Sequence, residues 1–71
     1  MWRNRVISGC NVCMKIYSEP SAEFGLLGGR ISKLEVRKNG VILANYDRGW
    51  DILPYFPEWT EILSELIHKY N

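Results

Sequence analysis

The sequence predicts an α+β fold, in which a four-stranded antiparallel sheet (β-β-β-β) is packed by one C-terminal helix. Residues 11–18, NVCMKIYS, alternate apolar and polar side chains, as a half-buried strand does. An Asn39-Gly40 pair separates two strand-like stretches and is a strong hairpin signal. Residues 57–70 place apolar side chains at helical spacing. A chain of 71 residues has room for one core, so residues 1–71 are expected to form a single domain.

The first two strands are predicted at about residues 2–8 and 12–18, joined by Gly9, Cys10 and Asn11 as a hairpin. In the second strand one face carries Val12, Met14 and Ile16, and the other carries Cys13, Lys15 and Tyr17. The stretch EPSAEFGLLGG that follows contains one proline and three glycines, which is typical of a loop.

The third and fourth strands are predicted at about residues 30–38 and 41–46. A two-residue type I′ turn fixes their register and places Lys38 opposite Val41, Val36 opposite Leu43, and Leu34 opposite Asn45. We therefore assign one face to the core: Leu34, Val36, Val41 and Leu43. The other face is expected to be half solvated or to meet a partner: Ile31, Lys33, Glu35, Arg37, Ile42, Ala44, Tyr46 and Arg48.

The helix is predicted at about residues 57–70. Pro57 suits a first helical position, and Glu58 and Glu61 suit the positive end of the helix dipole. One apolar stripe is expected to cover the sheet: Trp59, Ile62, Leu63, Leu66, Ile67 and Tyr70.

The composition places limits on the class of protein. The sequence has no apolar run of signal-peptide or membrane-span length, which favours a cytoplasmic protein with no membrane partner. Residues 1–46 hold seven basic and three acidic groups, and residues 47–71 hold two and five. This asymmetry suits contact between copies or capture of a small anion, and disfavours a dedicated nucleic-acid binder. Because so short a chain buries only about 60% of its unfolded surface, a homodimer or larger assembly is expected.

Two cysteines form a Cys10-x-x-Cys13 pair. A structural zinc site needs two more ligands, and His68 is the only histidine in the chain. We interpret the pair as ordinary cysteines at a hairpin, with a metal shared between two copies as the alternative. No metal and no other cofactor is predicted.

Other motifs give little support to catalysis or to a classical nucleotide fold. The stretch GLLGGRIS leads into a strand, whereas phosphate-binding glycine loops lead into a helix, although an anion-binding backbone nest beside Arg30 stays open. His68 lies four residues after Ser64, as expected for a half-exposed helical residue. Asp47 and Asp51 could act as a catalytic carboxylate pair only with a third element, and the sequence offers none. We therefore expect no enzymatic activity.

The stretch YDRGWD, with the strand start near Arg30, is the most suggestive part of the chain for binding. The candidate ligand-binding residues are Arg30, Ser32, Lys33, Tyr46, Asp47, Arg48, Trp50 and Asp51. One interpretation is structural: an arginine pairs with Asp47 or Asp51 while Trp50 packs under the helix. The other is functional: guanidinium groups grip phosphate or carboxylate and the indole stacks on a base.

The same residues carry a resemblance over roughly residues 15–52. The stretches EPSAEFGLLGGRISKLEV and ANYDRGWD resemble an uncharacterised family of small proteins of bacterial genomes and phages. The matching positions are Pro20, Ser21, Gly25, Gly29, Arg30, Ile31, Ser32, Lys33, Leu34, Tyr46, Asp47, Arg48, Gly49 and Trp50. The resemblance implies a phage or mobile-element context in a bacterial host cell and supplies no activity. The first hairpin, with both cysteines, falls outside this pattern.

These observations lead to one expected function and two alternatives. The first is a non-enzymatic, phage-type binding protein that sequesters an anionic, nucleotide-like signal molecule, in an anti-defence role. The second is a protein–protein inhibitor of a host factor, acting through aromatic residues such as Tyr55, Phe56 and Trp59. The third is a nucleic-acid-binding accessory protein whose basic contacts would be Arg3, Arg5, Lys15, Arg37 and Lys38.

Overall fold

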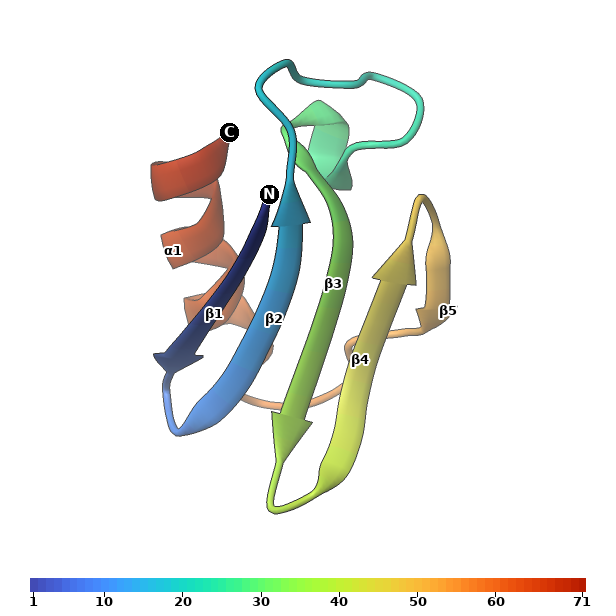
Figure 1. Cartoon of the computed structure of the whole chain (residues 1–71). Coiled ribbons are helices and arrows are strands. Elements are labelled where there is room, and N and C mark those ends of the chain that lie inside the picture. The colour runs from blue at the N-terminus through green and yellow to red at the C-terminus, as the bar shows by residue number, and fades with distance from the viewer.

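The chain folds as one antiparallel sheet with a C-terminal helix against one of its faces, an α+β architecture (Figure 1). The structure is a computed structural model that describes all residues from Met1 to Asn71. The sheet holds five strands in chain order: β1 (Trp2–Ile7), β2 (Cys10–Ile16), β3 (Ile31–Lys38), β4 (Val41–Asp47) and β5 (Trp50–Ile52). A short 3-10 helix, η1 (Leu26–Gly28), precedes β3, and α1 (Trp59–Tyr70) follows β5.

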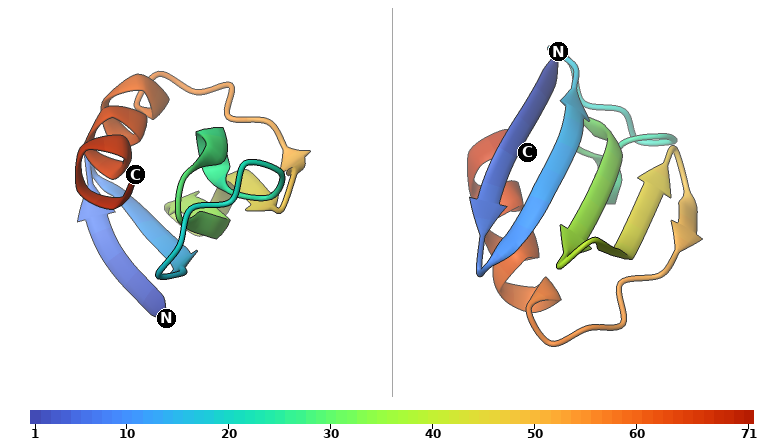
Figure 2. Two further views of the ribbon diagram at one scale, coloured as in Figure 1. Left: turned by 90° about the horizontal axis from the view of Figure 1, so that it is seen from above. Right: turned by 60° about the horizontal axis from the view of Figure 1, so that its bottom comes forward.

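The helix covers the sheet on the side of β1 and β2, and the opposite face of the sheet carries no other element (Figure 2). We call this uncovered side the open face. Fourteen buried apolar residues form the core between the sheet, α1 and η1. From the helix come Ile62, Leu66 and Tyr70, which are all buried. The one α-helix, α1, has 12 residues and is not a candidate for a membrane span.

The first hairpin turns at Ser8 and Gly9, whose φ angles are 52° and 76°. Positive φ at both central residues is what a tight type I′ turn requires. The turn is therefore shorter than the predicted Gly9-Cys10-Asn11 connection, and Cys10 opens β2. The predicted core face of this strand is confirmed, since Val12, Met14 and Ile16 are buried.

The second hairpin turns at Asn39 and Gly40, with φ angles of 52° and 79°. Lys38 pairs with Val41 as predicted, but Val36 then faces Ala44 and Leu34 faces Tyr46. The reason is a bulge in β4, where Leu43 is an extra residue without a partner in β3.

The bulge changes which side chains of β4 enter the core. Ala44 and Tyr46 are buried, whereas Val41 is exposed, so the predicted core face of this strand is wrong. Leu43 is half-buried and packs at the margin of the core.

The prediction of four strands is wrong, because residues 50–52 form a fifth. Trp50 pairs with Tyr46 and Ile52 pairs with Asn45. The chain reverses because Arg48 adopts a left-handed conformation with φ 56°, and the Asp47 N–H donates to the Gly49 carbonyl at 2.8 Å. The segment expected to link the sheet to the helix is therefore a third, short hairpin.

The helix was expected to begin at Pro57, but it begins two residues later, at Trp59, and Glu58 occupies the N-cap position. Its final backbone bond runs from the Asn71 N–H to the Ile67 carbonyl at 3.2 Å.

Candidate functional site

The structure distributes the eight predicted site residues over separate places. Tyr46, Arg48 and Trp50 line one cleft between η1, β5 and α1. Lys33 and Asp47 lie together on the open face, and Arg30 lies against the C-terminal end of α1. Ser32 is buried and Asp51 is exposed in β5. The short hairpin of β4 and β5 thus brings three of the eight predicted residues together in one cleft, and the other five lie elsewhere.

The cleft that holds Tyr46, Arg48 and Trp50 has a volume of 460 Å³, and we call it the aromatic cleft. The Tyr46 and Trp50 rings meet edge to face, with centroids 5.0 Å apart and planes at 70°. Trp50 meets Trp59 of α1 in the same way, at 5.5 Å and 84°. The remaining walls are Glu23, Leu26, Leu27, Gly49, Pro54 and Leu63.

The loop before β3 is tied to this cleft by one hydrogen bond. The Tyr46 hydroxyl donates to the Phe24 carbonyl at 3.0 Å. Leu26 is buried in the core at the base of the loop. A methyl group added at Gly25 would lie 1.9 Å from the Gly29 carbonyl oxygen, so only glycine allows the loop to close on itself. The loop wall of the cleft is therefore fixed by a backbone contact.

Arg48 is the cation of the aromatic cleft. Its side chain is largely exposed, its Nε lies 3.8 Å from an Asp47 carboxylate oxygen, and its guanidinium lies 6.0 Å from the centre of the Phe24 ring. Such exposed ion pairs contribute little to stability. Its guanidinium therefore remains available to a ligand.

Elements of both interpretations of this segment occur in the structure. The contact of Arg48 with Asp47 and the packing of Trp50 on Trp59 of α1 are those of a structural cluster. Arg48 and Trp50 also line a cleft of ligand size, as the functional interpretation requires.

Arg30 has a different environment. Its Nε donates to the Tyr70 carbonyl at 3.0 Å, which satisfies one of the unpaired carbonyls at the end of α1. Arg30 also lines a second cleft, of 490 Å³, with Arg3, Tyr17 and Tyr70. This places its guanidinium outside the aromatic cleft.

Ser32 and Lys33 also lie apart from the cleft. Ser32 is only 2% exposed and sits in a β-bulge between Ile31 and Lys33. The Ser32 hydroxyl lies beside Tyr17 and, together with the Lys15 ammonium, lowers the pKa of the Tyr17 phenol. Lys33 projects from the open face, 3.9 Å from Asp47.

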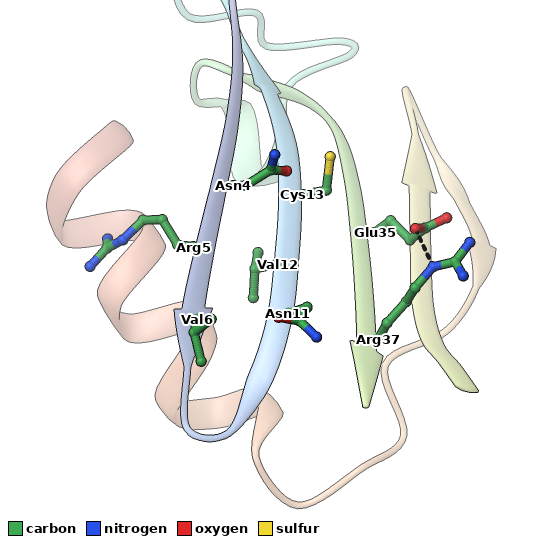
Figure 3. A pocket seen from close by; sticks show the side chains of 8 residues that line it. All are labelled: Asn4, Arg5, Val6, Asn11, Val12, Cys13, Glu35 and Arg37. Carbon is green, nitrogen blue, oxygen red and sulfur yellow. Dashed lines mark hydrogen bonds and ion pairs between the residues drawn. The ribbon is translucent and has the colours of Figure 1, made fainter. Parts of the chain in front are cut away.

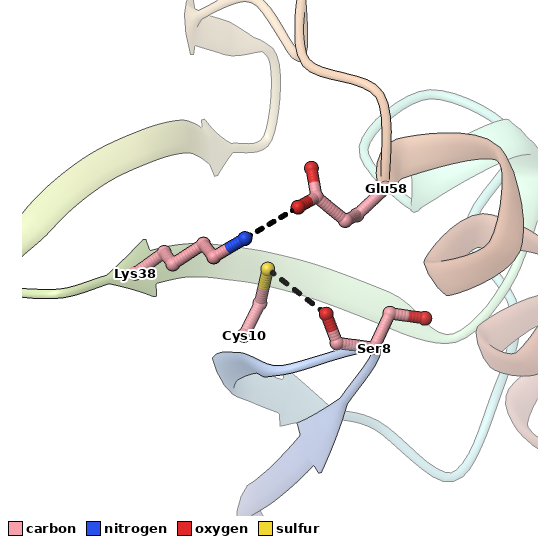
Figure 4. A network of polar contacts seen from close by, with 4 residues as sticks. All are labelled: Ser8, Cys10, Lys38 and Glu58. Carbon is pink, nitrogen blue, oxygen red and sulfur yellow. Dashed lines mark hydrogen bonds and ion pairs between the residues drawn. The ribbon is translucent and has the colours of Figure 1, made fainter.

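A second polar cluster joins the β3–β4 hairpin to the start of the helix (Figure 4). The Lys38 ammonium donates to the Glu58 carboxylate at 2.6 Å. This hydrogen bond lowers the pKa of Glu58 and raises the pKa of Lys38. Nearby, burial, followed by the Glu58 charge, raises the pKa of the Cys10 thiol. A protonated, buried thiol is a poor nucleophile.

The two cysteines lie on opposite faces of β2. Cys10 points into the core, and its thiol donates to the Ser8 carbonyl at 3.8 Å, whereas Cys13 lines the open face (Figure 3). Because side chains three apart on a strand point in opposite directions, the two thiols of one chain cannot bind the same ion. No group of three or more His, Cys, Asp or Glu side chains gathers to hold a metal.

Sequence reasoning missed Trp59 as part of the aromatic cleft. The helical pattern assigned Trp59 to the stripe that covers the sheet, and this residue does pack against the core. Its contact with Trp50 depends on β5, which turns Trp50 back toward the helix. Two tryptophans flanking a Pro-rich connection were the available signal.

Comparisons with known proteins give one result for the family. No curated protein and no solved structure matches the chain. The family model described as Domain of unknown function (DUF7678) matches residues 1–71, so the match includes the first hairpin and both cysteines, beyond the segment that carried the resemblance. The chain therefore belongs to the family Domain of unknown function (DUF7678).

Proposed function

We propose that this protein is a non-enzymatic binding protein that holds a planar, anionic, nucleotide-like ligand in the aromatic cleft. The observation that carries the proposal is the joining of Trp50, Trp59 and Arg48 around a space of 460 Å³. Small-molecule sites are typically clefts of about 300–1,000 Å³ with mostly apolar walls and a few polar groups.

Each wall of the cleft has a chemical role in this proposal. The indoles of Trp50 and Trp59 offer apolar surface to a flat ring. The Arg48 guanidinium suits a phosphate group, which it can bind bidentately. The Glu23 carboxylate can accept a hydrogen bond from an exocyclic amine of a base. A ring with an amine at one end and a phosphate at the other fits this set.

The biological role that we propose is stoichiometric sequestration of a signal nucleotide in the cytoplasm of a bacterial host, as an anti-defence protein of a phage or mobile element. The resemblance of residues 15–52 to small proteins of phages and bacterial genomes supports this context. No residue set in the cleft suggests bond-breaking chemistry, since Glu23 and Arg48 are its only ionisable side chains besides the phenol of Tyr46.

The test exploits the conformation of Arg48. Arg48 has φ 56°, in the left-handed region that glycine adopts without strain, so Arg48→Gly removes the guanidinium and relieves the backbone. We expect Arg48→Gly to weaken nucleotide binding at least tenfold while the free energy of unfolding stays equal or rises by about 1 kcal/mol. Isothermal titration calorimetry with a panel of mono- and cyclic nucleotides measures the binding, and urea unfolding measures the stability.

A matched control is available at Ser8, which also has positive φ, at 52°, and lies in the turn after β1. Ser8→Gly should leave nucleotide binding unchanged. Equal binding by Arg48→Gly and the native chain, or no binding of any nucleotide by the native chain, would contradict the proposed site.

The second candidate, a protein–protein inhibitor, is favoured by the segment after β5. Tyr55 is 85% exposed and Leu53 is 48% exposed, so two large, mainly apolar side chains of this segment face solvent. Exposed aromatic side chains are enriched at protein interfaces. Under this alternative, Tyr55→Ser abolishes capture of one host protein while Arg48→Gly has no effect.

We also propose that the protein self-associates through β1, which is a free edge of the sheet. Met1 and Ile16 exchange both backbone bonds, at 2.7 and 2.9 Å, so the alternation of an antiparallel pair points the N–H groups of Trp2, Asn4 and Val6 away from β2. These donors are available to the same strand of a second copy.

A further inference from the structure

The open face carries a row of four side chains, one from each of β1 to β4. Trp2 pairs with Lys15, Lys15 pairs with Lys33, and Lys33 pairs with Asp47. Side chains directly opposite on neighbouring strands lie about 4.5–5.5 Å apart at Cβ and interact. Trp2 and the two lysines are thus held close together by backbone pairing alone.

The pairing of Lys15 with Lys33 places two like charges directly opposite each other, which is unfavourable in a sheet. Asp47 offsets the charge of Lys33, at 3.9 Å, but Lys15 forms no ion pair. The Lys15 ammonium lies instead near two aromatic rings, 5.9 Å from the centre of Trp2 and 5.5 Å from that of Tyr17. A bound anion between the lysines would relieve their repulsion.

The two rings that flank Lys15 are accessible. Trp2, in β1, is 56% exposed, and Tyr17, which directly follows β2, is 46% exposed at the same end of the sheet. Both rings already lie close to the Lys15 ammonium, and such preorganisation lowers the entropy lost when a flat ligand stacks on them. Exposed aromatic rings beside lysines are the combination that stacks bases and contacts phosphates.

Tyr17 joins this row to the cleft of 490 Å³ around Arg30. That cleft is lined by Arg3, Tyr17, Arg30 and Tyr70 together with Met1, Ile16 and Ser18, and by no acidic side chain. The bond from Arg30 to the Tyr70 carbonyl uses Nε, which leaves the outer nitrogens of the guanidinium for a ligand. Tyr17 therefore stands between two pairs of basic side chains: Lys15 and Lys33 on the open face, and Arg3 and Arg30 on the helix side, where Arg3 pairs with the buried Met14.

The remaining open face offers groups that can recognise base edges. The next row along the strands holds Asn4, Cys13 and Glu35, and the row after it begins with Val6 and Asn11 (Figure 3). Asn45 of β4 pairs with Glu35 and completes the first of these rows. Amide side chains both donate and accept hydrogen bonds. Glu35 is occupied by Arg37, whose Nε lies 2.6 Å away, so its negative charge is locally neutralised.

We propose that the end of the open face around Trp2, Lys15, Tyr17 and Lys33 binds single-stranded nucleic acid. Bases stack on Trp2 and Tyr17, and phosphates contact Lys15 and Lys33 on the open face. The strand then continues past Tyr17 around the end of the sheet to Arg3 and Arg30 on the helix side. A single strand fits better than a duplex, since the bases of a duplex are stacked on each other and cannot reach the rings of a sheet surface. The site shares no residue with the aromatic cleft and is independent of the function proposed there.

The structure also selects which basic residues take part. Arg5, Arg37 and Lys38 are engaged in ion pairs with Glu65, Glu35 and Glu58. These pairs turn toward the helix or along the sheet and leave less charge for a phosphate. Lys15 has no such partner and is the residue on which the proposal depends most.

The test is fluorescence anisotropy with a labelled, mixed-sequence strand of ten nucleotides, as DNA and as RNA, between 50 and 200 mM salt. For single strands the logarithm of the affinity falls with the logarithm of salt by about 0.7 for each phosphate contacted, so four basic contacts predict a slope of about −3. Lys15→Gln should reduce this slope by about 0.7 and weaken binding several-fold at 50 mM salt. Trp2→Ala should weaken binding roughly tenfold without changing the slope.

Lys69→Gln is the matched control, since Lys69 is exposed on α1, away from the open face, and forms no ion pair. It should leave affinity and slope unchanged. Three results would overturn the proposal. They are no binding at 50 mM salt, a loss of affinity in Lys69→Gln equal to that in Lys15→Gln, or equally tight binding of a duplex of the same sequence. Because Trp2 and Lys15 project from the sheet surface, circular dichroism should show an unchanged fold in both variants.

Discussion

Among single residues, Glu58 has the most direct effect on stability that the structure allows us to predict. It accepts a hydrogen bond of 2.6 Å from Lys38 at the tip of the β3–β4 hairpin and occupies the N-cap position of α1. Twenty residues separate the partners, so no local pattern in the sequence could indicate the pair. The contact connects the sheet to the first turn of the helix.

Glu58→Gln should flatten the dependence of stability on pH in the acid range. The pKa of Glu58 is lower in the folded chain than its ordinary value of 4.5, because Lys38 donates to the ionised carboxylate. The folded state therefore binds this proton less readily than the unfolded state, and the stabilisation is complete above pH 4.5 and lost as the pH falls through the folded pKa.

Urea unfolding of the native chain and of Glu58→Gln between pH 6.5 and pH 3, at about half-unit steps, would measure the difference. The two free energies of unfolding should converge at the acid end. Parallel curves throughout this range would show that the contact does not form in solution.

At the scale of elements, the turn chemistry and the helical pattern were readable, and the irregular features were not. Asn39-Gly40 fixed one turn because both residues tolerate positive φ. The bulge at Leu43 was not readable, since an apolar residue in a strand gives no sign that it lacks a partner. The strand β5 was hidden because Arg48, rather than glycine, takes the left-handed position that starts it.

The helix is the element on which the core depends most, and Leu66→Ala tests this. Leu66 is fully buried against the sheet, and such truncations cost about 2–5 kcal/mol through lost burial and a residual cavity. The total free energy of unfolding of a native protein is only about 5–15 kcal/mol. The midpoint of thermal denaturation should therefore fall steeply in Leu66→Ala.

Thr60→Ala supplies the comparison, since Thr60 is exposed on the same helix. Its effect should stay within about 0.5 kcal/mol. Similar small losses for both variants would mean that α1 contributes little to the core.

For the whole molecule, the sequence indicated the class of fold but not which residues would meet. The predicted site failed to gather at one place because strand register decides which face each residue takes, and the bulges after Lys15 and in β4 change that register. Lys33 and Asp47 thus lie on the open face, while Tyr46 and Trp50 face the helix side. Three predicted residues reached a common cleft because β5 folds back beside β4.

Self-association through β1 can be tested with one backbone change. Val6→Pro removes the Val6 N–H, which points away from β2, so the pairing of β1 with β2 should survive while pairing with a second copy is lost. In native mass spectrometry and sedimentation velocity, we expect the native chain to form a dimer and Val6→Pro to be monomeric.

Val6→Thr keeps both the N–H and the branched side chain and should still form the dimer. A monomeric native chain at micromolar concentration, or a dimer that persists in Val6→Pro, would count against this interface.

The placement of Cys10 and Cys13 on opposite faces of β2 gives the native chain two built-in chemical reporters. A thiol reagent should modify Cys13 in the folded state, whereas Cys10, buried and with a raised pKa, should react only when the molecule opens. The labelling rate of Cys10 then follows the opening of the core, and a dye on Cys13 senses what arrives on the sheet surface. One unaltered polypeptide can thus report its own unfolding and its own occupancy in the same experiment.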